Sequence, residues 1–333
     1  MFKITAYGVR PIEVPYFHKL NHNHYDLNLV PDLLDQQNAN VAKGSDGVLL
    51  RGNCQADRHN LEQFKEWGIN YVFTRTVGVD HIDLPAAQEL GITVARVPSY
   101  SPYAVAELAL TLGMTLFRKV GAELTNTHAG RFTVADSYFS KEIHSSTVGI
   151  IGCGRIGAAE ARLYAGMGTT VLGYDPNSSD PHQKNGIPLV DLPELLQRAD
   201  LVSLHVPLIA GQTENLIGAT ELQMMKPAAI LINTARSQVV NLAAVTTALQ
   251  HHQLGGYGAD VVVDERHIFG NDFATLADLP SPELRHLMEH FPNVIITPHV
   301  GSFTEPALQD MITTSYQNFA TTIATGTCPN VVQ

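Results

Sequence analysis

The stretch Thr147-Val-Gly-Ile-Ile-Gly152-Cys-Gly-Arg-Ile-Gly157 decides the fold of this 333-residue chain. An apolar run, Thr147–Ile151, leads directly into a Gly-x-Gly-x-x-Gly loop and then into a helix-like segment, residues 158–166. A second strand pattern ends in Asp175, 18 residues after Gly157. A strand, a glycine loop, a helix, a strand and an acidic residue in this order predict a dinucleotide-binding βαβ unit.

Each part of this loop has a physical task. We expect Gly152 to permit the tight turn, Gly154 to let a pyrophosphate approach the backbone, and Gly157 to let helix and strand pack closely. The helix N-terminus supplies free N–H donors and a positive dipole end. Asp175 would accept hydrogen bonds from both ribose hydroxyls and repel a 2′-phosphate, which favours NAD over NADP. The alternative is that Asp175 is a solvated charge at a strand end.

Cysteine usage bears on both the loop and the compartment. Cys153 inside the loop is most simply a spacer, but a helix N-terminus can lower a thiol pKa, so modification of Cys153 that blocks cofactor binding is an alternative. The other cysteines are Cys54 and Cys328. Three cysteines cannot all pair, which favours a reducing compartment, and we expect a cytoplasmic protein.

Length and composition indicate two globular domains. At roughly 150 residues per domain the chain holds about two. Hydrophobic residues make up 44% and charged residues 16%, which allows large cores and excludes general disorder. The formal charge of −11, with no basic block, argues against nucleic-acid and membrane partners.

The longest apolar-rich stretch, Tyr103–Phe117, is too short for the roughly 20 residues that span a bilayer. The N-terminus has no long apolar region and reads as a strand rather than a signal peptide.

Apolar segments alternate with helix-length segments along the chain, which predicts an α/β architecture. Their continuous apolar character suits strands buried on both faces of parallel sheets. The expected strands are Lys3–Tyr7, Gly47–Leu50, Tyr71–Thr74, Thr93–Val97, Thr147–Ile151, Thr170–Tyr174, Leu201–His205, Ile230–Asn233, Gly258–Val262 and Val294–Thr297. The expected helices include Leu61–Trp67, Pro85–Leu90, Leu192–Arg198 and Leu242–His251.

Two prolines, Pro98 and Pro102, mark a domain boundary before a long helix pattern. We expect a nucleotide-binding domain over residues 103–299. The tail carries a further helix pattern around Ala307–Ile323 and is too small to form a domain. We therefore expect residues 300–333 to pack on residues 1–102 and make a discontinuous domain.

Arg236, Glu265 and His299 each follow an expected strand of the nucleotide-binding domain. In a doubly wound sheet the carboxyl ends of the strands converge on the ligand crevice. Each signal is weak alone, since a lone His is usually structural and Arg236 could form an ordinary ion pair. Together, after a dinucleotide loop, they indicate a catalytic group.

At this point the sequence resembles the NAD-dependent D-2-hydroxyacid dehydrogenases over essentially its whole length. The resemblance implies two doubly wound parallel-sheet domains that flank a cleft: a Rossmann NAD domain and a flavodoxin-like substrate domain. The family is usually dimeric through its nucleotide domain, so a homodimer is expected. The motifs that carry the resemblance are Thr76-Val-Gly-Val-Asp80, Val97-Pro-Ser-Tyr-Ser-Pro102, Ala104-Val-Ala-Glu107, Gly149–Gly157, His205-Val-Pro207, Asn233-Thr-Ala-Arg236, Leu254-Gly-Gly256 with Asp260 and Glu265, and Thr297-Pro-His299.

The resemblance implies a role for each matching residue. His299 would exchange a proton with the substrate oxygen, Glu265 would favour the imidazolium of His299, and Arg236 would grip the substrate carboxylate. The backbone N–H groups of Val77 and Gly78 would hold the same carboxylate, and Tyr100 would line the substrate pocket. Contacts to NAD are implied for Gly152, Gly154, Arg155, Ile156, Gly157, Asp175, Val206, Pro207, Gln212, Thr234, Ala235, Arg236 and Asp260. Gln212 departs from the commoner family pattern, which puts its contact in doubt.

Within the family, the long segment Asp264–Pro292 resembles the D-lactate dehydrogenase branch, and Glu265 argues against a formate dehydrogenase. Four stretches resemble (R)-2-hydroxyglutarate dehydrogenases closely: Arg51-Gly-Asn-Cys54, Phe139-Ser-Lys-Glu142, Gly301-Ser-Phe-Thr304, and Thr325-Gly326 with Cys328-Pro-Asn330. The small Ser302 would leave room for a longer substrate, and Arg51 would pair with a distal carboxylate such as that of 2-oxoglutarate.

Alternatives remain open at the level of the sequence. Arg51 could form only an ion pair within its own domain. The protein would then be a D-lactate dehydrogenase or a broad 2-oxoacid reductase. The same fold also occurs in NADH-sensing corepressors, which act as binding proteins. His-rich stretches with His18, His22 and His24 and with His251 and His252 lack partner ligands at fixed spacing, so no metal is expected.

Overall fold

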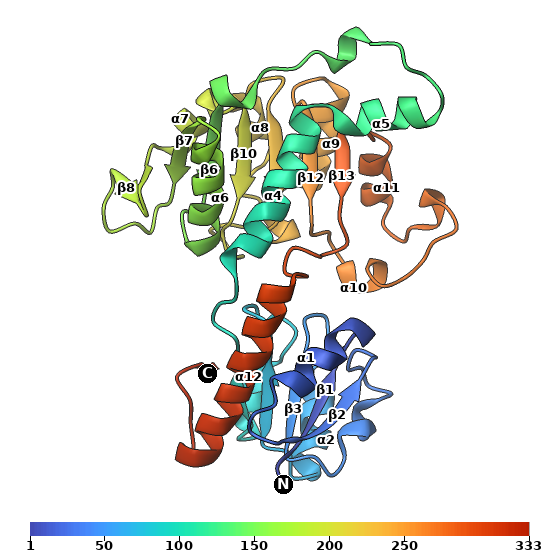
Figure 1. Cartoon of the computed structure of the whole chain (residues 1–333), viewed down its shortest axis with the longest axis vertical. Coiled ribbons are helices and arrows are strands. Elements are labelled where there is room, and N and C mark those ends of the chain that lie inside the picture. The colour runs from blue at the N-terminus through green and yellow to red at the C-terminus, as the bar shows by residue number, and fades with distance from the viewer. Residues whose placement is uncertain (333) are drawn as a thin grey trace. The chain divides into compact units, whose positions relative to one another are not determined.

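The computed structural model describes residues 1–332, which form two compact units (Figure 1). Unit 1 comprises Met1–Ser101 and the C-terminal segment from Phe303, and unit 2 comprises Pro102–Ser302. These boundaries lie a few residues from the expected ones, so Ser302 belongs to unit 2 rather than to the substrate domain.

Unit 1 is built on a six-stranded sheet with the order β14-β5-β4-β3-β1-β2. All neighbours pair in parallel except β14, which pairs antiparallel with β5. The parallel part has the flavodoxin-like order with its switch point between β1 and β3. The strands are β1 (Lys3–Tyr7), β2 (Asp26–Val30), β3 (Gly47–Leu50), β4 (Tyr71–Thr74), β5 (Thr93–Ala95) and β14 (Val331–Val332).

Both faces of this sheet are covered because its strands carry apolar side chains in both directions. Val48, Leu50 and Val72 pack with the helices on one face, whereas Ile4, Leu49 and Phe73 pack on the other. Phe73 stacks on Phe319 of the C-terminal helix with ring centroids 4.3 Å apart, so the tail packs on the N-terminal part of the chain. The helices are α1 (Val14–Lys19), α2 (Arg58–Glu66), α3 (Leu84–Glu89) and α12 (Glu305–Thr325).

Unit 2 is built on a parallel sheet with the order β13-β12-β11-β10-β6-β7. A single parallel bridge between Gly173 and Leu189 extends it beyond β7, which completes the doubly wound pattern of dinucleotide-binding folds with its switch point between β6 and β10. The strands are β6 (Thr147–Ile151), β7 (Thr170–Tyr174), β10 (Leu201–Leu204), β11 (Ile230–Asn233), β12 (Gly256–Ala259) and β13 (Val294–Ile296), with a hairpin of β8 (Gln183–Lys184) and β9 (Ile187–Pro188) at the side.

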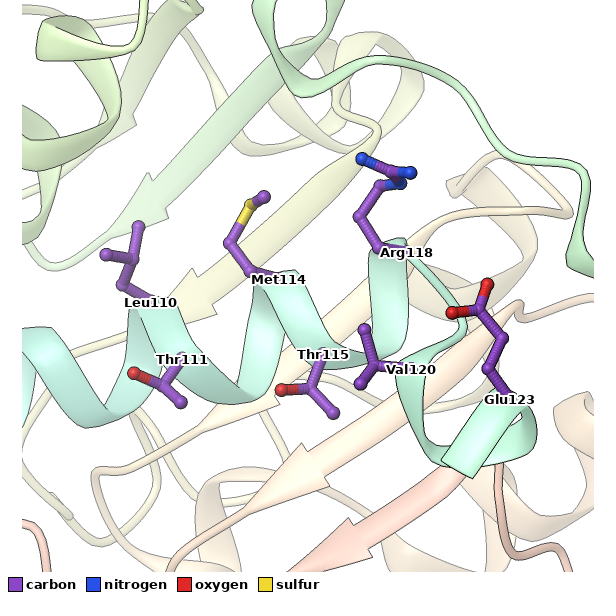
Figure 2. A pocket seen from close by; sticks show the side chains of 7 residues that line it. All are labelled: Leu110, Thr111, Met114, Thr115, Arg118, Val120 and Glu123. Carbon is purple, nitrogen blue, oxygen red and sulfur yellow. The ribbon is translucent and has the colours of Figure 1, made fainter. Parts of the chain in front are cut away.

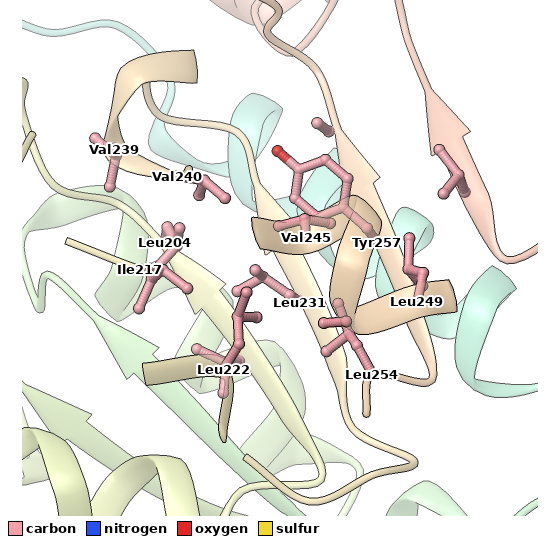
Figure 3. Packing of buried hydrophobic residues seen from close by; sticks show 14 of the residues in the cluster. Leu204, Ile217, Leu222, Leu231, Val239, Val240, Val245, Leu249, Leu254 and Tyr257 are labelled. Carbon is pink, nitrogen blue, oxygen red and sulfur yellow. The ribbon is translucent and has the colours of Figure 1, made fainter. Parts of the chain in front are cut away.

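Two cores sandwich this second sheet. Leu204 and Leu231 face a core with α7, α8, α9 and α11, and Figure 3 shows Leu222, Val245 and Tyr257 packed there. Ile150 and Ile232 belong to the opposite core, which α4 and α6 cover. The helices are α4 (Pro102–Phe117), α5 (Val120–His128), α6 (Arg155–Gly166), α7 (Leu192–Arg198), α8 (Ala219–Met224), α9 (Leu242–Gln250), α10 (Glu265–Ile268) and α11 (Pro282–Met288).

The predicted α/β class with two doubly wound sheets is confirmed, with local corrections. The expected strand Gly258–Val262 begins earlier, at Gly256, and ends at Ala259. The two edge strands β2 and β14 were not expected, and β14 runs antiparallel to its sheet. None of the described helices is both long and apolar enough to cross a membrane.

Candidate functional site

The glycine loop lies at the switch point of the unit 2 sheet, between β6 and α6. Gly152 has a φ of +92°, and a Cβ there would lie 2.7 Å from the His205 carbonyl oxygen at the end of β10. A Cβ on Gly157 would overlap the Gly152 carbonyl oxygen, whereas one on Gly154 would meet no atom within 4 Å. Gly152 and Gly157 are therefore required because a side chain at either position would collide with the backbone. Gly154 leaves the loop open to solvent.

Asp175 follows β7 and reaches the loop from the side. Its Oδ2 accepts a hydrogen bond from the Cys153 N–H at 2.9 Å, and the Lys184 ammonium lies 2.8 Å from the same oxygen. Oδ1 accepts from the Asn177 N–H at 3.1 Å. The carboxylate is thus fixed at the end of the second strand, where the sequence predicts a ribose contact.

Cys153 is fully buried against Gly173 of β7. Burial, reinforced by the nearby Asp175 charge, raises the pKa of its thiol to about 12. A buried, protonated thiol is a poor nucleophile. The geometry therefore favours the spacer interpretation of Cys153 over a reactive thiol.

The other predicted cofactor residues lie on the loops that follow β6, β10 and β11. Arg155 is exposed at the start of α6, and Ile156 beside it is half-buried. Val206 is half-buried, whereas Pro207 and Gln212 are exposed. The Thr234 hydroxyl is buried without a hydrogen-bond partner among the described residues, and Ala235 next to it is buried.

These features fit a dinucleotide. A helix N-terminus behind an open glycine is suited to bind a pyrophosphate. The fixed Asp175 carboxylate can accept from a ribose hydroxyl, and the unpartnered Thr234 hydroxyl can bond a polar group that enters its loop. Both lie at carboxyl ends of strands, where ligands bind in open α/β sheets.

His299 and Glu265 meet beyond the ends of the neighbouring strands β12 and β13. Nδ1 of His299 lies 2.9 Å from Oε1 of Glu265. The exposed fractions of the two side chains are 40% and 22%. The bond to Glu265 orients the ring and leaves Nε2 as the nitrogen that can exchange a proton with a ligand.

Asp260 holds the segment that carries His299. Its Oδ1 accepts from the Thr297 hydroxyl at 2.6 Å and from the Val300 N–H at 2.9 Å, and its Oδ2 accepts from the Gly301 N–H at 2.7 Å. Burial raises the pKa of the Asp260 carboxyl, and these bonds oppose that rise. His299 has a φ of +54°, which is uncommon for a residue with a side chain, so the clamp secures an otherwise unfavourable backbone. Asp260 is a predicted cofactor residue, and the hydrogen bonds that its carboxylate accepts in the structure come from Thr297, Val300 and Gly301 of the chain itself.

Arg236 lies at the end of β11, the neighbour of β12 in the sheet. The buried Asn233 shapes the turn before it: its Nδ2 donates to the Arg236 carbonyl at 2.9 Å and its Oδ1 accepts from the Ala235 N–H at 3.0 Å. Arg236 is half-buried, and its Nη1 donates to the Ala235 carbonyl at 2.8 Å. The predicted catalytic residues therefore come from three consecutive strands, with direct contact between His299 and Glu265.

In unit 1, Arg51 lies at the end of β3, beside the switch point between β1 and β3. Burial, together with the charges of Arg10 and Arg75, lowers the pKa of Arg51 to about 10, which leaves it a cation at neutral pH. The one carboxylate in this group, Glu13, lies 3.0 Å from Arg75 and 3.5 Å from Arg10. Arg51 itself has no ion pair or hydrogen bond from its guanidinium within residues 1–332. Residues 1–332 thus contain no ion pair of the kind that the alternative interpretation of Arg51 expects.

The other predicted substrate residues are also accessible. Val77 is 36% exposed, Gly78 is half-buried, and their backbone N–H groups donate to no group in the described part of the chain. Tyr100 in unit 1 and Ser302 at the end of unit 2 are half-buried. Two adjacent N–H groups of this kind can donate hydrogen bonds to a carboxylate.

Metal-binding clusters, disulfides and surface hollows add nothing to these groups within residues 1–332. No cluster of three or more His, Cys, Asp or Glu residues could hold a metal ion, and Cys54, Cys153 and Cys328 are all unpaired. A hollow of about 430 Å³ is lined by residues of α4, of α5 and of the link between them: Leu110, Thr111, Met114, Thr115, Arg118, Val120 and Glu123 (Figure 2). It contains none of the predicted catalytic or cofactor residues.

Sequence reasoning missed three residues that contact the candidate site. Lys184 and Asn185 of the β8–β9 hairpin reach Asp175 and the Cys153 carbonyl, each at 2.8 Å. Glu160 of α6 is fully buried, and its Oε2 lies 2.5 Å from Nε2 of His205. The one sequence signal for Glu160 is that an acidic residue stands at an inward-facing position of the α6 helix pattern. No local sequence feature predicts that the β8–β9 hairpin contacts the site.

Comparison with known proteins gives a consistent result. Residues 110–301 match the model for "D-isomer specific 2-hydroxyacid dehydrogenase, NAD binding domain". The chain is 33% identical to an aromatic 2-oxoacid reductase of Clostridium sporogenes, over 98% of each chain. It is 34% identical to a D-2-hydroxyacid dehydrogenase (NAD(+)) of Clostridioides difficile, over 99% of each chain. Among solved structures, D-lactate dehydrogenase with NAD+ from Lactobacillus jensenii matches with a TM-score of 0.84 and 35% identity, covering 100% of both chains.

Proposed function

Because the chain belongs to the D-lactate dehydrogenase branch of the D-isomer specific 2-hydroxyacid dehydrogenases, which are NAD-dependent oxidoreductases, we propose that it reduces a 2-oxo acid with a second carboxylate. The leading substrate is 2-oxoglutarate, and the reaction is reversible. No observation favours the alternative of an NADH-sensing binding protein.

The proposed chemistry assigns one task to each group. Bound NADH supplies the hydride that reduces the carbonyl carbon. His299 donates the proton to the carbonyl oxygen through Nε2 while Glu265 retains the other ring nitrogen. Arg236 grips the 2-carboxylate with its planar guanidinium, and the N–H groups of Val77 and Gly78 donate to the same carboxylate. In the reverse direction His299 accepts the proton.

The observation that carries the substrate class is the unpartnered guanidinium of Arg51. Arg51 is half-buried, and a partly desolvated charge is normally paired because desolvation penalises an isolated one. The carboxylate of Glu13 pairs with Arg10 and Arg75, which leaves the nearby guanidinium of Arg51 without a carboxylate of its own. A second carboxylate on the substrate would pair with Arg51 and offset its desolvation. Ser302, as a small residue, and Tyr100 are proposed to line the space for the longer side chain.

The second candidate is a broad 2-oxoacid reductase or D-lactate dehydrogenase. The name of the Clostridium sporogenes relative, an aromatic 2-oxoacid reductase, favours this reading. In that case Arg51 would interact only with the charges around it in unit 1 and not with substrate. Substrates with a single carboxylate would then give the highest kcat/KM.

The test is NADH oxidation at 340 nm with pyruvate, phenylpyruvate, oxaloacetate and 2-oxoglutarate, for wild type and Arg51→Gln. Loss of a charge-assisted bond of about 1.5–3 kcal/mol should lower kcat/KM for 2-oxoglutarate by about 10- to 100-fold. We expect kcat/KM for pyruvate to change by less than about threefold. Arg58→Gln is the matched control, since Arg58 is an exposed arginine of the same unit that pairs with Glu89.

Each outcome decides between the candidates. Preference for 2-oxoglutarate, lost selectively in Arg51→Gln, supports the dicarboxylate substrate. Preference for pyruvate or phenylpyruvate, unchanged in Arg51→Gln, contradicts it and favours the broad reductase. NADH binding without turnover of any substrate would contradict the enzymatic proposal itself.

We also propose that the protein is a cytoplasmic homodimer formed through unit 2. Its three cysteines are unpaired, which suits a reducing compartment. Helix α5 has no buried residue, and the segment from it onward exposes Leu124 (63%), Phe132 (79%), Val134 (86%) and Phe139 (93%). Apolar side chains gathered on one segment mark an interaction site. A second copy would cover them and use the hollow between α4 and α5 shown in Figure 2.

A further inference from the structure

The β8–β9 hairpin brings a cation to the residue that is expected to select the cofactor. Lys184 ends β8, and its ammonium lies 2.8 Å from Oδ2 of Asp175. Asn185, the next residue, donates to the Cys153 carbonyl at 2.8 Å and has a φ of +53°. The hairpin therefore contacts both Asp175 and the glycine loop.

The Asp175 carboxylate has little capacity left for a ribose. A carboxylate offers about four acceptor sites on its two oxygens. The Cys153 N–H and the Lys184 ammonium use two on Oδ2, and the Asn177 N–H uses one on Oδ1. Two ribose hydroxyls need two sites, so Lys184 occupies one that the adenosine ribose of NAD would use.

The charge at this position also differs from that of a lone carboxylate. An unpaired Asp repels a 2′-phosphate, but the Lys184 ammonium neutralises the charge at 2.8 Å. The side chain of Lys184 is 30% exposed and that of Asp175 is 9% exposed, so the ammonium is the more accessible of the two. A flexible lysine is able to move from a carboxylate to a phosphate.

We infer that Lys184 is a second cofactor-specificity residue and that this protein binds and uses NADPH as well as NADH. The ammonium pairs with Asp175 when a ribose hydroxyl is present and turns to the phosphate when a 2′-phosphate is present. The inference rests on the proposed placement of the adenosine ribose at Asp175. A purely structural role, in which Lys184 only fastens the hairpin to the loop, predicts instead that both cofactors respond alike.

The experiment is calorimetric titration of the intact protein with NADH and with NADPH, accompanied by kcat/KM for each cofactor. In Lys184→Met we expect NADPH to bind about tenfold more weakly, because a charge-assisted contact to the phosphate is lost. NADH should bind within about twofold of wild type, because Asp175 regains an acceptor site as its cation is removed. Lys184→Arg, which keeps the cation, should retain NADPH binding.

Arg198→Met is the matched control: it removes a cation from an exposed ion pair with Glu194 on α7 of the same unit, and both affinities should stay at wild-type values. Equal weakening of NADH and NADPH in Lys184→Met, or no change in either, would overturn the inference. Failure of wild type to bind NADPH would overturn it as well.

Asp175→Asn separates this inference from its premise. If the ribose lies at Asp175, the variant weakens NADH binding and shifts preference toward NADPH. If both affinities stay unchanged in Asp175→Asn, the placement of the ribose is wrong. If Asp175→Asn shifts the preference while Lys184→Met does not, the placement holds and only the role of Lys184 fails.

Discussion

At the scale of the residue, the proposed chemistry of this protein depends on how His299 is held. Its ring is oriented by Glu265 at 2.9 Å, and its left-handed backbone lies within a segment, residues 297–301, that donates three hydrogen bonds to Asp260. The imidazole is thereby presented in one orientation with Nε2 available. This arrangement suits a general acid, since the efficiency of proton transfer depends on position before acidity.

His299→Gln tests that role. The variant keeps a polar side chain of similar reach but cannot exchange a proton, so turnover should fall about 10²-fold or more. The dissociation constant of NADH should stay near the wild-type value. Stopped-flow reduction and calorimetry measure the two quantities. His286→Gln, on an exposed histidine of α11, is the control, and wild-type-like turnover in His299→Gln would contradict the assignment.

At the scale of the element, Asp200 fixes the start of the strands that carry the glycine loop. It precedes β10, and its carboxylate accepts from the Thr147 N–H at 3.0 Å and from Lys141 and Lys226 at 2.9 and 3.0 Å. Burial by itself would raise the pKa of the Asp200 carboxyl, but these donors outweigh burial and leave the pKa below its usual value. The carboxylate therefore stabilises the paired start of β6 and β10.

Asp200→Asn should show this as a pH-dependent loss of stability. A carboxyl whose pKa is lowered by folding contributes stability above its unfolded pKa of about 3.9 and loses it as the pH falls through the folded value. At pH 7 we expect the free energy of unfolding to drop by about 2 kcal/mol, the scale of hydrogen bonds to a charged group. The difference should shrink between about pH 4 and pH 2 in urea titrations. A difference that stays constant with pH would contradict the role of the charge, and Asp180→Asn, on a half-buried carboxylate that no lysine contacts, provides the control.

At the scale of the whole molecule, we propose that the exposed apolar side chains of residues 124–139 form the contact between two copies of the chain. We expect sedimentation equilibrium of wild type to give twice the 36.2 kDa of one chain. Phe132→Asp with Phe139→Asp should give the single-chain mass, because two charges would be buried in the interface without partners. Leu276→Asp, at a 51% exposed leucine elsewhere in unit 2, should stay dimeric. A wild-type protein with the mass of one chain would contradict the proposed dimer.

The sequence by itself determined what is encoded locally. Eight of the ten expected strands match the observed ones to within one residue at each end, and Thr147–Ile151 and Tyr71–Thr74 match them fully. The match is close because strands buried in a parallel sheet appear in the sequence as continuous apolar runs. The glycine loop and Asp175 could be predicted from the sequence because their spacing follows from the length of one βαβ unit. The edge strands β2 and β14 were not readable: β2 is half-buried with polar residues, and β14 has two residues.

Only the tertiary structure decided which side chains pair. Arg51 lacks an ion pair because Glu13, distant in sequence, is already shared by Arg10 and Arg75. Lys184 reaches Asp175 because the β8–β9 hairpin turns back toward β7. Local sequence fixes periodicity and turn geometry, whereas the pairing of charges depends on which strand ends lie side by side, and that is a property of the folded sheet.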